Sequence, residues 1–408
     1  MIRRKCSSIF AWRTFSHHPG FTIGHRWHLS FHHVAIVLSA LCIIFNTGQT
    51  IGLALFLASF PKLTGVYFVT FFGAFAYGFF CVLITFWFAY KGQITPAMRE
   101  WRWIRYMFYV SIFDAANALL ITFSSHGSRV PPAITSILSQ ITIPFTFIFS
   151  KLLLKKNYRW LHFSSIGFVL LGVIFSLIPT FKQIHDGTAD TTLKQGWYWP
   201  FVYILGCIPS AIKTIIQERL QVEFTKYARE REEKITRFSV IYFQAVETMF
   251  QVTIIVLCFP LDLVPGFGTS DSIDQWWSSF SDGFKCLFNV GHTLNDRCHI
   301  AAGTGMLYIV SCLLASVIGT FLTDHTSANW LAIVSSISPL LSTSFWFIFP
   351  GINRWAGVVD VTGWDIGFNL GALPIVFIGM VLYQSGGTDR QVDEETSLID
   401  KHPTEFLW

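Results

Sequence analysis

The sequence predicts an all-α membrane protein with ten transmembrane helices. Of its 408 residues, 52% are hydrophobic and only 13% are charged, and the mean hydropathy is +0.50. Soluble domains carry roughly 25% charged residues, so this composition excludes a water-soluble globule, a disordered chain and a nucleic-acid-binding protein. The 42 Phe, 15 Trp and 12 Tyr residues fit a lipid environment, where aromatic rings gather near the headgroups.

A helix that crosses the hydrocarbon core needs roughly 20 apolar residues, because lipid satisfies none of its backbone polar groups. The ten stretches that meet this requirement are His33–Phe60, Gly65–Tyr90, Arg105–Phe123, Pro131–Leu154, Leu161–Phe181, Pro200–Arg219, Phe238–Phe259, Gly303–Leu322, Trp330–Phe349 and Thr362–Leu382. A long polar loop, residues 260–302, separates the seventh span from the eighth.

The distribution of positive charge predicts that both termini face the cytosol. With that orientation, 21 of the 29 Lys and Arg residues lie on the cytosolic side, seven lie on the opposite side, and Lys213 lies within a span. Residues 1–32 then form a cytosolic arm, 33–382 the membrane domain and 383–408 a cytosolic tail. The arm also resembles an organellar transit peptide, but the positive-inside rule explains its charges without cleavage.

An internal repeat predicts two inverted halves, residues 33–181 and 200–382. The segment Ile137–Thr142 of the fourth span resembles Ile333–Ser338 of the ninth at an offset of 196 residues. Because each half contains five spans, the second half inserts in the opposite direction to the first. This architecture occurs in many secondary transporters, whose substrate sites lie near the membrane midplane. A chance match between two apolar segments is the alternative.

Polar residues and prolines inside the spans indicate helices that line a wet cavity, because lipid would leave their polar groups unpaired. Ordinary helix packing is the alternative reading for the prolines. The uncharged candidates are Asn46 and Gln49 in the first span, Ser139 and Gln140 in the fourth, and Ser335 and Ser336 in the ninth. The helix-breaking candidates are Pro144, Pro209 and Pro339.

Ionisable residues within the spans are the strongest candidates for binding and coupling, because a charge near the bilayer centre costs at least about 2.5–3.5 kcal/mol. Asp114, near Asn117, lies in the third span, and Lys213 lies in the sixth. Glu247 is flanked by Gln244 and Gln251 at spacings of three and four residues, which place all three on one helical face. A carboxylate that exchanges between proton and solute is one role, and a permanent salt bridge with Lys213 is the other.

The long loop predicts an amphipathic helix in the membrane interface between Asp271 and Phe288. Trp276, Phe280 and Phe284 recur at steps of four residues, and charged residues fall mostly on the other face. Cys286 and Cys298 follow closely. In a non-reducing lumen they can pair, with roughly 3 kcal/mol of loop constraint, and two free thiols are the alternative.

The C-terminal tail contains a pattern typical of an acidic dileucine sorting signal for endosomes, lysosomes or vacuoles. It consists of Glu394 together with Leu398 and Ile399. Cytosolic sorting adaptors are therefore possible partners, although such short patterns also arise by chance.

Three groups of residues resemble the chloroquine-resistance-transporter-like family of the drug/metabolite transporter superfamily. They are Ser111–Ala115 with Ser139–Pro144, Ile208–Ala211 and Glu218 with Phe250, Gln251 and Pro260, and Gly283–Phe288 with Ile333–Ile337. The resemblance implies ten helices in inverted halves, juxtamembrane helices and a predominantly acidic cavity. It also implies export of amino acids, peptides, glutathione or cationic drugs from digestive-vacuole, lysosome-like or plastid membranes.

The chain departs from the malarial members of this family in two ways. Those members carry four loop cysteines, whereas this loop contains only Cys286 and Cys298. They also place a lysine in the first span, and its absence here leaves open whether the solute is neutral or cationic.

These observations together predict a vacuolar or lysosomal secondary transporter that exports small organic solutes to the cytosol by alternating access, with proton coupling. The spans one to four and six to nine are expected to line its cavity. The sequence lacks Walker, HExxH and GxSxG motifs, so neither ATP-driven nor hydrolytic chemistry is indicated, and no cofactor or metal is expected. The alternatives are a nucleotide-sugar or triose-phosphate exchanger, and a non-transporting receptor or scaffold.

Overall fold

The computed structural model describes residues 21–23, 27–29, 31–60, 65–153, 160–185, 197–231, 239–290, 297–325, 328–356 and 363–401. The α-helices are α1 (Phe31–Ala58), α2 (Val66–Tyr90), α3 (Trp101–Ser124), α4 (Pro132–Leu138), α5 (Thr142–Leu153), α6 (Trp160–His185), α8 (Trp199–Glu230), α9 (Ser239–Leu257), α10 (Ile273–Leu287), α11 (Ala301–His325), α12 (Ala328–Ile348), α13 (Pro350–Trp355) and α14 (Gly363–Lys401). The short elements are strands β1 (Phe21–Ile23) and β2 (Trp27–Leu29) and 3-10 helices η2 (Pro96–Arg99), η3 (Ser139–Ile141), η4 (Phe259–Leu263) and η5 (Arg297–Ile300).

The helical membrane architecture predicted from the sequence is confirmed. Nine helical segments among the described residues are long and apolar enough to cross a membrane. The ninth predicted span corresponds to α12, whose described apolar part, Ile337–Ile348, is shorter than the other nine. The all-α expectation needs one small correction, because β1 and β2 form an antiparallel hairpin that pairs Phe21 with Leu29.

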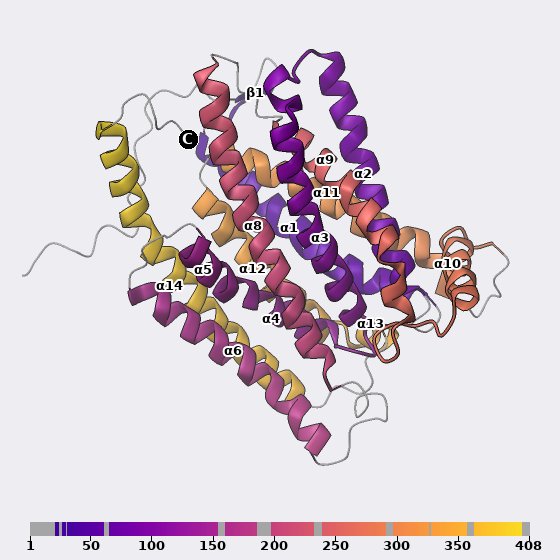
Figure 1. The fold of residues 1–408 in the computed structure, drawn as a ribbon. Coiled ribbons are helices and arrows are strands. Elements are labelled where there is room, and N and C mark those ends of the chain that lie inside the picture. The colour runs from indigo at the N-terminus through magenta and orange to yellow at the C-terminus, as the bar shows by residue number, and fades with distance from the viewer. Residues whose placement is uncertain are drawn as a thin grey trace, which may run out of the picture.

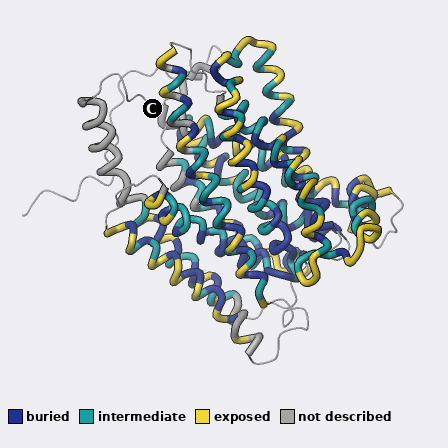
Figure 2. Tube along the Cα trace, viewed as in Figure 1, coloured by how far each residue is buried: buried dark blue, intermediate teal, exposed yellow. Residues whose placement is uncertain are grey.

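The long helices pack in specific pairs (Figure 1). Helix α1 packs on α11, α2 on α9, α3 on α8, α12 on both α4 and α1, and α6 on α14. The α6–α14 pair lies at one edge of the bundle, and α10 lies at the other. The outward faces of the helices carry many exposed aromatic and aliphatic side chains, as lipid contact requires (Figure 2).

Two glycines allow α1 and α11 to approach each other closely. Gly48 and Gly52 are four residues apart and therefore lie on one face of α1. A Cβ atom at Gly52 would lie 3.0 Å from the backbone nitrogen of Tyr308, and one at Gly48 would lie 2.8 Å from the Ser311 Oγ. This is the small-residue packing through which membrane helices bring their backbones together.

The fourth predicted span is interrupted before Pro144. Helix α4 ends at Leu138, η3 covers Ser139–Ile141, and α5 begins at Thr142. Proline lacks an N–H group and its ring clashes with the carbonyl four residues earlier, here that of Gln140, so the break falls where the helix is weakened. By contrast, α8 and α12 continue through Pro209 and Pro339, so these two prolines do not break their helices.

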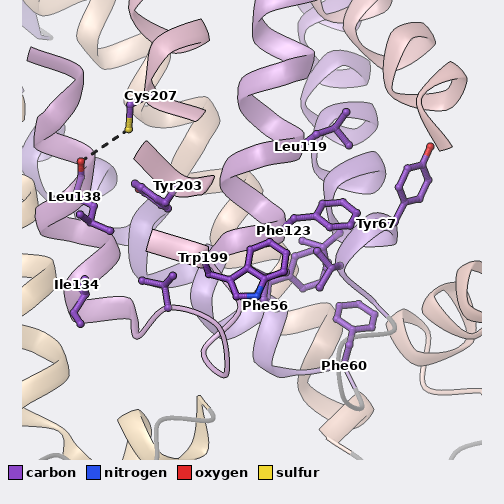
Figure 3. Close-up of a cluster of buried hydrophobic side chains, with 14 of the residues drawn as sticks. Phe56, Phe60, Tyr67, Leu119, Phe123, Ile134, Leu138, Trp199, Tyr203 and Cys207 are labelled. Carbon is purple, nitrogen blue, oxygen red and sulfur yellow. Dashed lines mark hydrogen bonds between the residues drawn. The ribbon is translucent and has the colours of Figure 1, made fainter. Parts of the chain in front are cut away.

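An apolar cluster fills one end of the bundle, which we call the loop side because η4, α10 and η5 lie there. Phe56, Phe60, Tyr67, Phe123 and Trp199 are all at most 6% exposed in this loop-side cluster (Figure 3). The Sγ of Cys207, farther along α8, lies 3.9 Å from the carbonyl oxygen of Leu138.

The cluster also holds a buried cation, Arg129, which is 7% exposed. Its guanidinium group lies 3.7 Å from the ring centroid of Trp199 and donates a hydrogen bond of 2.7 Å to the Phe123 carbonyl. Burial lowers the pKa of Arg129 to about 10. Arg129 therefore remains charged at neutral pH and joins the α3–α4 turn to the start of α8.

A second apolar cluster lies at the opposite end of α3 and α8. Its core is Met98, Trp103, Met107, Leu220 and Phe224, each at most 2% exposed, and we call it the opposite-side cluster.

An ion network lies next to the opposite-side cluster. The carboxylate of Glu223 lies 2.9 Å from Arg102 and 2.8 Å from Arg219. Partial burial raises the pKa of Glu223, but the hydrogen bonds from Arg219 and Tyr106 bring it below its ordinary value. The ion network therefore holds α3 to α8 at neutral pH.

The predicted helix of the long loop is present as α10, and it packs on the start of α2. Phe280 and Phe284 lie with their ring centroids 5.8 and 4.8 Å from that of Phe68. Cys286 and Cys298 form a disulfide with a Cα–Cα distance of 4.6 Å, which settles the choice between a bridge and two thiols. The disulfide ties the end of α10 to the start of α11.

Several predictions fall outside what the structure describes. The N-terminal arm is described only at residues 21–23, 27–29 and 31–32. The side chains of Glu394, Leu398 and Ile399 lie outside the described side chains, although α14 itself extends to Lys401.

We expect Gly283→Ala to weaken the docking of α10, because a Cβ there would lie 2.5 Å from the Cγ of the fully buried Phe68. Such overpacking costs about 1–3 kcal/mol, which a lower midpoint of thermal unfolding in detergent would register. Gly303→Ala is the matched control, since a Cβ on that glycine meets no atom within 4 Å. Equal midpoints for the two variants would contradict the proposed contact.

We expect Cys298→Ser to lower the free energy of unfolding by roughly 3 kcal/mol, because it opens the loop closed by the disulfide. Cys258→Ser, which removes a half-buried free thiol, is the control. Thermal unfolding is measured with and without reductant. The difference between wild type and Cys298→Ser must disappear under reduction, and a difference that persists would show that the bridge is not its cause.

Candidate functional site

A cavity of about 460 Å³ lies between the two apolar clusters. Helices α1, α2, α3, α4, α8, α9 and α11, together with η3, supply its lining. On α3 the lining begins at Asp114, about one turn beyond Val110, the last α3 residue of the opposite-side cluster, and on α8 it ends at Lys213. We expect spans one to four and six to nine to line the cavity, and spans one to four and six to eight supply lining residues. The lining contains no described residue of α12, the ninth span.

The cavity wall combines amides, hydroxyl groups and aromatic rings. Seven residues singled out from the sequence line it, namely Gln49, Asp114, Asn117, Ser139, Lys213, Gln244 and Gln251. Among its described residues, only Asp114 and Lys213 carry a charge. This lining can hydrogen-bond a polar solute and can accommodate the flat or apolar part of an amphipathic one.

Lys213 forms ion pairs with both predicted carboxylates. Its Nζ lies 2.8 Å from Oδ1 of Asp114 and 3.1 Å from Oε1 of Glu247. The side chain of Gln217 donates a hydrogen bond of 2.7 Å to Oε2 of Glu247. The three charged groups come from α8, α3 and α9, so one ammonium group joins three helices.

The two carboxylates differ in their access to the cavity. The Asp114 side chain is 11% exposed and lines the cavity, whereas that of Glu247 is 1% exposed and lies behind Lys213. Gln244 and Gln251 line the cavity, but Glu247 on the same helical face does not. The polar face predicted for the seventh span is therefore only partly wet.

We call Asp114, Glu247 and Lys213 the ion trio. In their ionised forms their charges sum to −1. An uncompensated charge is strongly unfavourable in a low-dielectric interior, so the ion trio has room for one more positive charge. A proton and a solute cation both satisfy this requirement. The ion pairs with Lys213 that the sequence offered as one reading are therefore present, and exchange of a carboxylate between proton and solute stays a prediction.

Three other candidate residues, Asn46, Gln140 and Ser335, do not reach the cavity. Asn46 donates to the Cys42 carbonyl at 2.9 Å, within its own helix. Gln140 is 8% exposed and donates to the Ser139 Oγ at 3.3 Å. Ser335 is half-buried, and the side chain of Ser336 lies outside the described residues.

The sequence analysis missed several lining residues, namely Tyr77, Tyr203, Tyr308, Cys312 and Ser316. The Tyr77 hydroxyl group donates to the Ser316 Oγ at 3.1 Å. A Cβ at Gly73 would lie 3.1 Å from the Tyr308 ring. In an aromatic-rich chain these tyrosines are not distinctive, but Gly52 and Gly73, which both lie against Tyr308, are a signal that sequence inspection can use.

Residues 36–383 match the family described as CRT-like, chloroquine-resistance transporter-like. The chain belongs to this family, as its sequence motifs indicated.

Two relatives illustrate the similarity. Crt homolog 2 of Dictyostelium discoideum is 21% identical over 332 residues, which cover 75% of this chain and 62% of that protein. The chloroquine resistance transporter of Plasmodium falciparum is 22% identical over 255 residues, which cover 59% of this chain and 55% of that protein. The chain therefore spans less than two thirds of the length of these relatives.

We expect Lys213→Met to destabilise the protein by about 3–5 kcal/mol at pH 7.5, because it leaves two buried carboxylates facing each other. Adding Glu247→Gln should recover most of this loss by removing the repulsion. The free energy of unfolding in detergent is the measurement, and Lys226→Met, which removes an exposed lysine, is the control. A Lys213→Met protein as stable as the control would contradict the ion trio.

Proposed function

We propose that this protein is a secondary transporter that moves small organic solutes across a membrane by alternating access. The observation that carries the proposal is a cavity with a polar wall that lies between two apolar clusters and contains an ion trio short of one positive charge. Its membership of a family with transporter-named relatives supports the same function.

We propose that ten helices cross the membrane as two inverted five-helix halves. In this proposal α12, the ninth span along the chain, crosses in addition to the nine long apolar segments described above. Under this symmetry α1 corresponds to α8 and α3 to α11, so the α1–α11 pair maps onto the α8–α3 pair. The α2–α9, α4–α12 and α6–α14 pairs each map onto themselves. All five pairs occur in the packing, which is the support for the repeat.

The two apolar clusters serve as the gates in this proposal. The loop-side cluster joins the ends of α1 and α3 to the starts of α2 and α8, and the opposite-side cluster joins α3 to α8. Separating one cluster while the other stays closed exposes the cavity to one side of the membrane at a time. Because burial of apolar surface stabilises each closed gate, the solute has to favour the exchange between them.

We propose proton coupling and export to the cytosol from an acidic vacuole or lysosome. A proton on the ion trio neutralises its charge of −1 when the cavity is empty, and a cationic or zwitterionic solute can take its place. The excess of Lys and Arg in the connections opposite the loop side supports cytosolic termini. The disulfide between Cys286 and Cys298 supports a non-reducing compartment on the loop side, and the amphipathic character of α10 supports its proposed place in the membrane interface.

The rival functions fit the site less well. An exchanger of phosphorylated sugars needs arginine or lysine side chains free to hold a phosphate, whereas Lys213, the one cation among the described lining residues, already faces two carboxylates. A receptor or scaffold needs no cavity with a charged wall. The tail motif around Glu394 is proposed as the contact for sorting adaptors.

The proposal predicts that Glu247→Gln abolishes the dependence of solute flux on a pH gradient. With Glu247 neutral, Asp114 and Lys213 balance each other and no proton is required. Uptake of amino acids, peptides, glutathione and cationic drugs into reconstituted vesicles, with and without the gradient, is the measurement.

The control for this experiment is Glu230→Gln, which removes an exposed acid near the end of α8. Flux that responds equally to the gradient in both variants would overturn coupling through Glu247. An absence of flux for every solute in the wild type would overturn transport itself.

A further inference from the structure

The ammonium group of Lys213 occupies the position that a cationic solute would take. It lies within 3.1 Å of a carboxylate oxygen on either side, at the wall of the cavity. We propose that Lys213 is a tethered counter-ion that a solute ammonium displaces from Asp114, and that it thereby fixes the charge of the solute the site accepts. The inference rests on the proposed function only in that a solute enters the cavity.

Asp114 and Glu247 differ in their access to the cavity, so a solute cation displaces Lys213 from Asp114 and not from Glu247. Asp114 lines the cavity, so an incoming cation reaches this carboxylate first. Glu247 is 1% exposed and is held by Gln217, so it stays with Lys213. Lys213 is itself 20% exposed and has a flexible four-carbon stem, so its ammonium can withdraw from Asp114 without leaving Glu247.

The net charge of the ion trio determines how many positive charges the preferred solute carries. With Lys213 present, the trio lacks one positive charge, and a single solute ammonium brings the sum to zero. Without Lys213 the two carboxylates lack two positive charges. The sign and size of this deficit depend on the trio alone, because the described lining of the cavity carries no other charged side chain.

The test compares two probes of equal length, pentylamine with one charge and 1,5-diaminopentane with two. Binding is measured by calorimetry on the full-length protein in lipid nanodiscs at pH 8, where both amines are fully protonated. For Lys213→Met we expect the ratio of the two dissociation constants to shift by about tenfold toward the diamine.

The second variant is Lys213→Met combined with Glu247→Gln, which restores the charge of −1 and leaves Asp114 without an internal competitor. We expect it to bind pentylamine about tenfold more tightly than the wild type does. A lysine with a purely structural role predicts no such gain. This variant also keeps the test decisive if Lys213→Met alone fails to fold.

Lys182→Met, which removes a lysine outside the cavity, should match the wild type in both measurements. The inference is overturned if the double variant binds pentylamine no more tightly than the wild type. Vesicle flux of the same probes separates the two proposals. Tighter binding without flux contradicts transport and leaves the role of Lys213 standing, whereas flux with affinities independent of residue 213 contradicts only that role.

Discussion

The arrangement of this protein depends on the high free energy of an isolated charge inside a membrane. Asp114, Glu247 and Lys213 come from three different helices, and none of them is stable there without the others. The attraction of both carboxylates to Lys213 fixes where α3, α8 and α9 meet. The amide and hydroxyl groups of the cavity wall gather around that point, because a lipid-facing position would leave them without partners.

Apolar packing complements this constraint on both sides of the cavity. Several buried aromatic residues lie at the loop side, where Phe56, Phe123 and Trp199 fill the space between helix ends. Arg129 is tolerated there because it stacks on Trp199 and donates to two backbone carbonyls. The interior therefore alternates between dry, wet and dry layers along the helices, which is the division that alternating access requires.

Much of the fold follows from the sequence, because span length and apolar composition are properties of single segments. The helix α10 and the interruption before Pro144 are equally local. The site was predictable only in part. Asp114, Glu247 and Lys213 are recognisable as costly residues, but whether Lys213 pairs with one acid or with both depends on the packing of three helices. For the same reason Glu247 is buried while Gln244 and Gln251 are wet. The tyrosines of the wall carry no charge, so the sequence does not distinguish them from those that contact lipid.

The proposed symmetry relates two helix pairs that are held together by different forces. Between α1 and α11 the contact is backbone against backbone at Gly52, and dispersion forces of this kind vanish within a small separation. Between α3 and α8 the ion pair of Arg102 with Glu223 attracts across a longer range, since the Coulomb energy decays slowly with distance. We therefore expect a small separation of the helices to remove the contact at Gly52 before it removes the attraction between Arg102 and Glu223. A change in membrane thickness that separates helices is expected to loosen the α1–α11 contact first.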